Sequence, residues 1–283
     1  YLVRHGTEEQ KKKYLPKLVT GELVSAIAMT EPGVGSDLQS ITTTAIQDGN
    51  GYRINGAKTY ISNGQTADFI IVVAKTDPKE RAKGISLMLL ETEGAEGFQR
   101  GKKLDKVGLD AQDTSELFFD DVFVPSDAVL GGVEGQGFYQ LMGELPQERL
   151  IIAMGAMTTI ERALEETVAY VKDRKAFGKT IWDFQNTQFT LADLKARGTA
   201  ARIFVNDCIA KHLESKLDVP TACMAKYWLT ELQGEVVDKC LQLHGGAGYI
   251  NDYPIARMYR DSRITRIFGG SNEIMKMVIA RSI

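Results

Sequence analysis

Histidine and cysteine are scarce in this sequence, which contains three of each. So few histidines argue against a multi-histidine metal site. The cysteines are odd in number, lack CxxC spacing and lie on helix-like segments, so they predict buried thiols in a reducing compartment. We therefore expect neither a disulfide framework nor a bound metal. The residues concerned are His5, His212, His244, Cys208, Cys223 and Cys240.

An excess of one charge and a long apolar run are also missing. The 34 basic and 37 acidic residues leave a net charge of −3, so no basic field suggests nucleic acid or a membrane surface. No stretch approaches the roughly 18 apolar residues that predict a membrane span. We expect neither nucleic acid nor a membrane span among the partners of this protein.

The first residues lack an initiator Met, a signal peptide and a transit peptide. The opening run YLVRHGTEEQKKKYLPKL is typical of the middle of a helical region, so we expect a fragment of a longer protein. Because nothing indicates import, the sequence favours a bacterial cytoplasm, with the mitochondrial matrix as the location in a eukaryote.

Residues 21–130 are built of short segments rich in β-branched and aromatic residues, such as FIIVVAK and GISLMLLE. Turn signals such as Asn55-Gly56 separate them, and no helical pattern intervenes. This order predicts an antiparallel β-barrel or sandwich, because a parallel sheet would need crossover helices.

From Gly137 the hydrophobic period becomes helical, and we assign 131–283 to a second domain. Pro220 suits the first turn of a helix, and a short last helix is expected at 272–283. Four helices with compact connections predict a C-terminal four-helix bundle. The fold class is therefore α+β, with a β-domain followed by helices.

Four glycine-containing stretches could be chemical, and each has an ordinary structural explanation. TEPGVGSD at 30–37 could be a plain Gly-Pro loop, and RKAFG at 174–178 a helix C-cap at Gly178. QLHGGAGY at 242–249 could end a helix around a structural histidine, His244, and FGGSNEI at 268–274 could be a capped helix start. Glu148, near the start of a helix, could be an ordinary partner of the helix dipole.

Taken in order, these stretches together with YISNG and RDSRITRIFGGSNEI resemble the signature segments of the acyl-CoA dehydrogenase family. The resemblance covers essentially the whole chain. It implies a three-part protein, of which residues 1–20 are the end of an N-terminal helical domain, 21–130 the middle β-domain and 131–283 the helical bundle. It also implies FAD as the cofactor, and a homotetramer, built from dimers, in which a neighbouring subunit helps to hold the adenosine end.

The same resemblance implies roles for particular residues. FAD is expected to contact residues of both domains: Ile27, Thr30, Gly35, Ser36, Tyr60, Ile61, Ser62, Arg174, Phe177, Gln185, Gln242, Gly245, Gly246, Ser271, Asn272 and Glu273. The substrate is expected near Ser36, Tyr139, Pro146, Gln147, Arg149 and Gly269.

Many family members carry the catalytic Glu directly after an aromatic residue, but here Phe268 is followed by Gly269. The long-chain and isovaleryl branches carry the base on the first bundle helix instead, which is where Glu148 lies. The run ELPQERLIIA is most similar to the long-chain branch. The resemblance thus implies Glu148 as the base.

The implied reaction is α,β-dehydrogenation of a fatty acyl-CoA to the trans-2-enoyl-CoA. Electrons would pass to an electron-transfer flavoprotein. The alternatives are a non-catalytic flavin- or acyl-CoA-binding paralogue, and an acyl-CoA oxidase that passes electrons to oxygen.

Overall fold

The computed structural model describes all residues from Tyr1 to Ile283, and the chain divides into two compact units. The N-terminal unit comprises 1–106 and 110–144, and the helical unit comprises 145–283 with the short segment 107–109. By contacts within the chain, the division falls after Glu144, inside a long helix, whereas the change of sequence pattern lies near residue 130. A single helix that starts in one unit and continues in the next hides such a boundary from pattern analysis.

Two helices open the N-terminal unit, α1 (Leu2–His5) and α2 (Glu8–Thr20). Thr7 and Gln10 form a reciprocal capping box at the start of α2, and Gly21 ends it in the left-handed conformation. The Gln10 side chain also donates to the carbonyls of Asp127 and Val129, 2.8 Å from each. This buried amide ties α2 to the segment that follows the last strand of the sheet.

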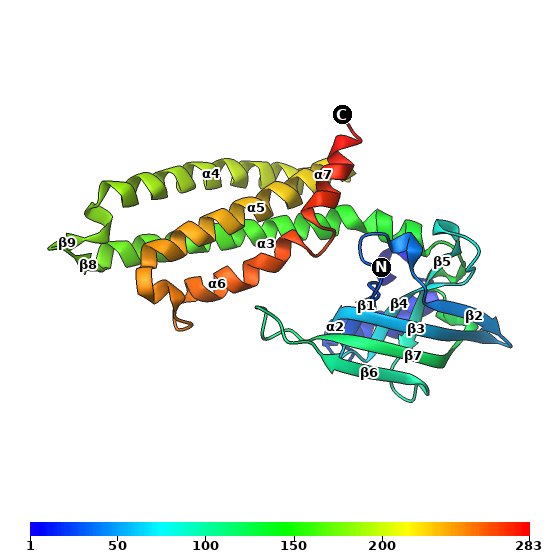
Figure 1. Ribbon diagram of the computed structural model, residues 1–283. Helices are drawn as coiled ribbons and strands as arrows, with labels where there is room; N and C mark the ends of the chain where they lie inside the picture. Colours follow the sequence, from blue (N-terminus) through cyan, green and yellow to red (C-terminus); the bar gives the residue numbers. More distant parts are fainter. The chain divides into compact units, whose positions relative to one another are not determined.

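The N-terminal unit contains a seven-stranded sheet (Figure 1). Its path runs β1-β4-β2-β3-β7-β6, and β5 pairs with β4. The strands are β1 (Ser25–Ala28), β2 (Thr44–Asp48), β3 (Gly51–Ser62), β4 (Phe69–Lys75), β5 (Ile85–Glu91), β6 (Phe98–Lys103) and β7 (Thr114–Pro125).

The α+β class is confirmed, but the expectation of purely antiparallel pairing was wrong. β4 pairs in parallel with β1 and β2, while the other pairs are antiparallel. β4 is also buried on both faces: Ile70 and Val72 enter one core, and Phe69 and Ile71 enter the other. Such a continuous apolar run is typical of a parallel-paired strand, and FIIVVAK carried that signal.

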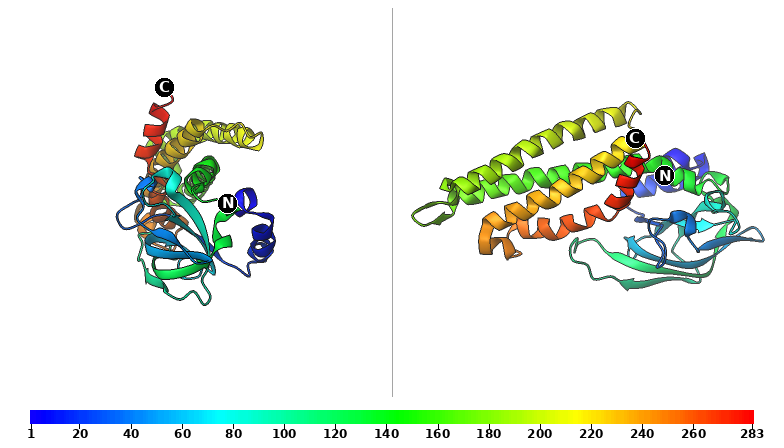
Figure 2. Two further views of the ribbon diagram at one scale, coloured as in Figure 1. Left: turned by 90° about the vertical axis from the view of Figure 1, so that its right-hand side faces the viewer. Right: turned by 45° about the horizontal axis from the view of Figure 1, so that its top comes forward.

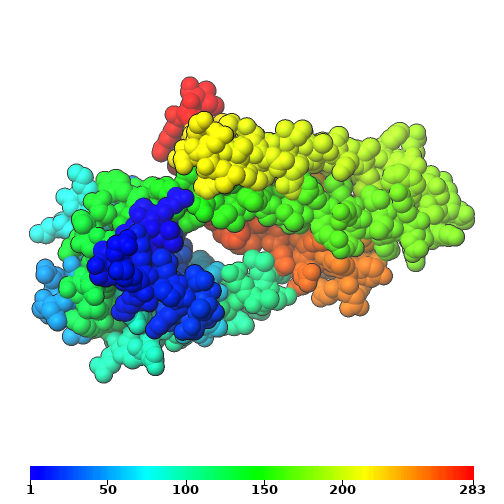
Figure 3. All heavy atoms as spheres, turned by 180° about the vertical axis from the view of Figure 1, so that it is seen from behind, coloured from blue at the N-terminus to red at the C-terminus, as the bar shows by residue number.

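Five helices form the helical unit: α3 (Gly137–Asp173, which begins in the N-terminal unit), α4 (Gln185–Leu213), α5 (Val219–His244), α6 (Pro254–Ser262) and α7 (Asn272–Ala280). The long helices α3, α4 and α5 lie side by side in both views of Figure 2 and share one apolar core. From behind, α4 runs along α3 on one face of the unit (Figure 3). All three cysteines are buried and free, as expected.

The sequence pattern missed α6 and misplaced Gly178. α6 is only nine residues long and lies between glycine-rich stretches, so its few buried residues give little periodicity. The segment after α3 is not a helix C-cap but a hairpin, β8 (Lys175–Ala176) and β9 (Lys179–Thr180), in which Phe177 and Gly178 both have positive φ. Seven short 3₁₀ turns complete the chain: η1 (Leu38–Ser40), η2 (Ala82–Gly84), η3 (Ser126–Ala128), η4 (Leu130–Gly132), η5 (Ile181–Asp183), η6 (Gly245–Tyr249) and η7 (Arg263–Arg266).

None of the helices is both long enough and apolar enough to cross a membrane. No group of three or more His, Cys, Asp or Glu side chains is placed to hold a metal ion.

Candidate active site and cofactor-binding residues

The loop after β1 is held by a buried ion pair. Lys58, from β3, has no exposed side-chain surface, and its Nζ donates to the Glu31 carboxylate and to the Met29 carbonyl, 2.9 Å from each. The Glu31 carboxylate also accepts from the Thr42 amide and hydroxyl and from the Thr43 amide. A carboxylate and an ammonium buried together, with their remaining hydrogen bonds satisfied, fix the loop that contains Thr30.

Burial and charge act in opposite directions on this pair. Desolvation by itself raises the pKa of Glu31, but the Lys58 charge and the hydrogen bonds from Thr42 and Thr43 outweigh it and lower that pKa to about 2. Burial lowers the pKa of Lys58 to about 8, although Glu31 opposes that change. The carboxylate is therefore ionised throughout the neutral range.

A β-bulge turns Tyr60 outward beside the same loop. The pairing of β3 with β7 shifts register between Lys58 and Ile61, and Tyr60 adopts φ +59. Its side chain is 68% exposed, and the preceding amide, of Thr59, donates to the Thr30 carbonyl at 2.9 Å. Bulges commonly re-aim a side chain at a functional site. The structure thus brings Thr30 and Tyr60 together at the end of β1.

The other expected residues of the N-terminal unit differ in their exposure. Ile61 is buried, Ile27 and Thr30 are half-buried, and Gly35, Ser36 and Ser62 are exposed. Tyr139, proposed for the substrate, is half exposed near the start of α3. The accessible backbone of Gly35 has no atom within 4 Å of where a Cβ would stand.

One end of the helical unit gathers a second group of expected residues: Arg174, Phe177, Gln185, Gln242, Gly245 and Gly246. The ends of α3 and α5 meet there, because the Tyr170 hydroxyl donates to the His244 carbonyl at 3.1 Å and the two rings stack at 4.3 Å. His244 is buried and its Nδ1 bonds the Cys240 carbonyl, so it is a structural histidine, as expected.

This end presents an exposed aromatic ring and two glycines with open space around them. Phe177 is 94% exposed at φ +53, and a Cβ on Gly245 or Gly246 would meet nothing within 4 Å. Arg174 and Gln242 are exposed as well. A guanidinium, an amide side chain, two unhindered glycines and an aromatic face suit the phosphates and ring of a dinucleotide. They are compatible with part of FAD, the cofactor expected from the sequence.

The opposite end of the helical unit brings α3 against the turn before α7. Ile152 contacts Gly269, since a Cβ built on that glycine would lie 2.4 Å from the Ile152 Cδ1. Glu148 lies one turn earlier on the same face of α3 as Ile152. The base predicted from the resemblance therefore lies on the helix face that borders the glycine predicted to donate its amide.

Glu148 is half-buried and lies well inside α3, which begins at Gly137. The alternative that it is a first-turn partner of the helix dipole is therefore wrong, because the dipole acts within the first turn. Pro146 and Gln147 are half-buried beside it, and Pro146 lies within the helix. The change to a helical period at Gly137 agrees with this start of α3.

Arg149 is 5% exposed, and its Nη1 donates to the Cys223 Sγ at 3.2 Å. Its Nε is buried and has no hydrogen-bond partner within the protein. Ser271 caps α7 by accepting from the Ile274 amide, as one alternative predicted. Asn272 is buried, and its side chain bonds to residues of α5, so this side chain is committed within the helical unit. Glu273 is exposed in the first turn of α7.

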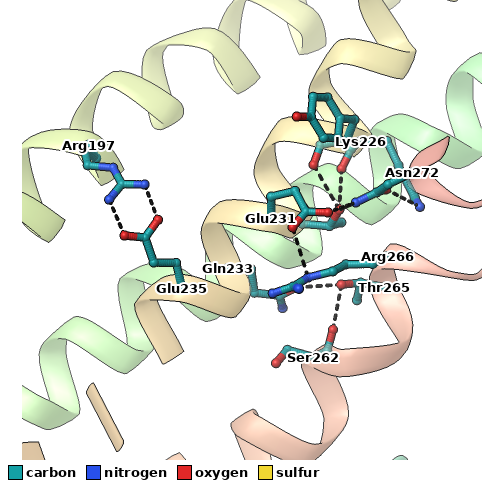
Figure 4. A network of polar contacts seen from close by, with 11 residues as sticks. Arg197, Lys226, Glu231, Gln233, Glu235, Ser262, Thr265, Arg266 and Asn272 are labelled. Atoms are coloured by element: carbon teal, nitrogen blue, oxygen red, sulfur yellow. Dashed lines mark hydrogen bonds and ion pairs between the residues drawn. The ribbon is translucent and has the colours of Figure 1, made fainter. Parts of the chain in front are cut away.

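Sequence reasoning missed the buried lysines Lys58 and Lys226. Lys226 lies on α5 and is fully buried, and its Nζ donates to the Gly270 carbonyl at 2.8 Å. The same Nζ donates to the Asn272 Oδ1 at 2.9 Å; Figure 4 labels both of these residues. The available signal was a lysine beside Ala225 and Leu229 of the apolar stripe, where a charge rarely lies unless it is bonded.

A separate hollow of about 590 Å³ lies within the helical unit between α5 and α6. None of the expected site residues lines it, and two of its charged groups, Arg197 and Glu235, already form an ion pair (Figure 4). We therefore do not place the candidate site there.

Comparison with known proteins identifies the family of this chain. Residues 26–122 match the family model for the acyl-CoA dehydrogenase middle domain, and residues 135–283 match the C-terminal domain. The long-chain specific acyl-CoA dehydrogenase of Sus scrofa mitochondria is 52% identical over 285 residues, covering all of this chain. The chain spans 66% of the length of that relative.

Solved structures are similar over the whole chain. The crystal structure of an acyl-CoA dehydrogenase from Geobacillus kaustophilus superposes with a TM-score of 0.97 at 52% identity, covering 100% of this chain and 74% of the other. PigA, solved with FAD and proline, has a TM-score of 0.94 at 33% identity and covers 99% and 73%. The chain belongs to the acyl-CoA dehydrogenase family of FAD-dependent oxidoreductases.

Proposed function

We propose that this protein catalyses the FAD-dependent α,β-dehydrogenation of a fatty acyl-CoA thioester to the trans-2-enoyl-CoA, with Glu148 as the base. The observation that carries the proposal is the position of Ile152, which follows Glu148 on one face of α3 and contacts Gly269. The similarity to long-chain relatives supports a fatty acyl substrate.

The chain's own residues account for the proton step. An α-proton beside a thioester is too weakly acidic for a carboxylate in water, so the site must stabilise the developing enolate oxygen. The Gly269 amide is proposed to donate to that oxygen. As the α C–H bond breaks, the proton passes to the Glu148 carboxylate and the electron pair enters the enolate. When bound, FAD supplies the acceptor for the hydride that leaves the β-carbon.

The two groups of expected cofactor residues in the helical unit support a homo-oligomer. Lys226, near the Gly269 turn, and His244, at the other group, are 18 residues apart on α5, which is about 27 Å along a helix. One end of one cofactor cannot touch both groups of the same chain. We propose that Arg174, Phe177, Gln185 and the 242–246 segment reach the FAD of a partner chain, in a dimer of dimers.

Tyr139, Pro146, Gln147 and Arg149 are proposed to line the substrate site, and Ser36 to serve both ligands. The proposed electron acceptor is an electron-transfer flavoprotein. The proposed location is a bacterial cytoplasm, or the mitochondrial matrix in a eukaryote, and three buried free thiols are compatible with either.

The test is Glu148→Gln in the natural full-length protein. The substitution keeps the shape of the side chain but removes the base, so an acyl-CoA should no longer bleach the flavin under anaerobic conditions while FAD stays bound. The matched control is Glu165→Gln, an exposed residue of the same helix, which should bleach at the wild-type rate. Bleaching of the Glu148→Gln protein at that rate would exclude Glu148 as the base.

Two further readouts separate the alternatives. A wild-type protein that binds FAD but is never bleached by any acyl-CoA would be a non-catalytic paralogue. Stoichiometric hydrogen peroxide during aerobic turnover would identify an oxidase instead of a dehydrogenase.

A further inference from the structure

Lys226 is fully buried, yet neither group that its Nζ contacts is a carboxylate. Both are neutral acceptors, the Gly270 carbonyl at 2.8 Å and the Asn272 Oδ1 at 2.9 Å. A buried ammonium without a contacting counter-ion is costly. Burial, and after it the charge of Arg149, lower the pKa of Lys226 to about 8. Because burying this ammonium costs free energy, we expect Lys226 to have a role beyond packing.

The segment that Lys226 holds has an unusual backbone. Gly269 and Gly270 have φ of +65° and +87°, and Ser271 then caps α7. Two successive left-handed residues are not fixed by helix or sheet bonds of their own. Ile152 limits the turn at Gly269, and the Lys226 ammonium holds the carbonyl of Gly270 from the side of α5.

Asn272 links this ammonium to the rest of α5. Its Nδ2 donates to the Thr230 hydroxyl at 3.0 Å and to the Glu231 carboxylate at 2.7 Å, while its Oδ1 accepts from Lys226 (Figure 4). These bonds secure the first residue of α7 to α5 without involving the turn. The bond to the Gly270 carbonyl is therefore additional to what anchoring α7 requires.

We propose that Lys226 is a positioning residue, whose ammonium orients the Gly269–Gly270 turn so that the Gly269 amide meets the thioester oxygen. This inference rests on the proposed function, because it needs that amide to be the donor. It assigns Lys226 no contact with substrate. Without the ammonium, the Gly270 carbonyl loses its bond, the turn relaxes, and the enolate is less well stabilised.

The experiment measures enolate stabilisation directly, in the FAD-loaded, full-length protein. A 3-oxoacyl-CoA has an acidic α-proton, so its deprotonation can be followed by absorbance against pH without a catalytic base. The wild-type protein should lower the pKa of the bound ligand below its value in solution. Lys226→Met should raise that bound pKa by about one unit, a tenfold weaker stabilisation, with FAD content unchanged. The kcat should fall about tenfold and the KM should change much less, because the bond from the Gly269 amide strengthens mainly as negative charge develops on the thioester oxygen.

Three further variants control for a general effect on the fold. Lys226→Arg keeps the charge and donors and should restore most of the pKa shift, whereas Lys239→Met removes an exposed lysine from the same helix and should change nothing. Lys226→Gln keeps a donor without charge, should be easier to fold than Lys226→Met, and should show a smaller shift in the same direction.

Three outcomes would overturn the inference. The first is a folded, FAD-bound Lys226→Met or Lys226→Gln protein with the wild-type ligand pKa. The second is a wild-type protein that leaves the ligand pKa unchanged. The third is failure of all three Lys226 variants to fold, because the lysine would then serve the fold and not the turn. Failure of the proposed base is read separately, since Glu148→Gln removes flavin bleaching but should leave the ligand pKa shift in place.

Discussion

The two units of this protein each bury one lysine beside a segment expected to hold a ligand, but they compensate its charge differently. In the N-terminal unit, Lys58 meets the Glu31 carboxylate. In the helical unit, Lys226 meets only a carbonyl and an amide oxygen. Both lysines have a pKa near 8, but only Lys58 has a directly bonded partner whose own pKa is lowered, to about 2.

The difference separates a directly bonded ion pair from a buried lysine on which the charges of Glu231 and Glu273 act without a direct bond. Glu31 and Lys58 are bonded directly, so their attraction offsets the cost of burying both charges, as it does in many buried pairs. Lys226 has no directly bonded carboxylate, and its burial costs stability at neutral pH. The helical unit therefore gives up stability at the turn that we propose to be catalytic, as strained or functional sites commonly do.

The largest effect is expected from splitting the ion pair of Glu31 and Lys58. Lys58→Met leaves the Glu31 carboxylate buried without its counter-ion and should lower the free energy of unfolding by about 3–5 kcal/mol, measured by urea denaturation. Glu31→Gln should also destabilise. The double variant Glu31→Gln/Lys58→Met should lose less than the sum of the two, because no charge stays buried. Strictly additive losses would show that the two residues are not coupled.

The second prediction concerns how the free energy of unfolding depends on pH through Lys226, the buried lysine without a bonded carboxylate. The Lys226 pKa is about 8 in the folded protein and near 10.5 in the unfolded chain. Between these values the unfolded chain binds a proton that the folded protein lacks, so stability should rise with pH, by at most about 3 kcal/mol, and be constant in this respect below pH 8.

The measurement is urea denaturation of the wild type and of Lys226→Met at pH 7.5 and pH 10. The difference between the two proteins isolates Lys226 from other groups that titrate in this range. The free energy of unfolding of the wild type minus that of Lys226→Met should be larger at pH 10 than at pH 7.5. A difference that does not change with pH would mean that Lys226 binds its proton equally tightly in the folded and the unfolded protein.

The sequence predicted features that repeat along one element better than features that depend on contacts between distant residues. Periodicity found the strands and the long helices, because each repeats its burial pattern over many residues. The parallel pairing of β4, the hairpin at Phe177 and the helix α6 were missed, because they depend on partners or on too few residues. Motif order identified Glu148 and the glycine turns, but it could not reveal that Lys226 reaches Gly270 over 44 residues of sequence.

The smallest effect on stability is expected at Phe177. The backbone conformation of this residue can be compared with that of Tyr60 in the other unit. Each unit exposes an aromatic ring at positive φ beside expected cofactor residues, Tyr60 in one and Phe177 in the other. Phe177 is the first residue of a two-residue hairpin turn before Gly178, a position that favours asparagine. Phe177→Asn should therefore keep or slightly raise stability, by up to about 1 kcal/mol, but weaken FAD binding in the oligomer.

Fluorescence titration of the apoprotein with FAD measures that loss, and Phe177→Tyr, which keeps the ring, should bind nearly as the wild type does. If Phe177→Asn binds FAD with unchanged affinity, the exposed ring serves another contact, and the proposed reach of the hairpin to a partner's cofactor is wrong.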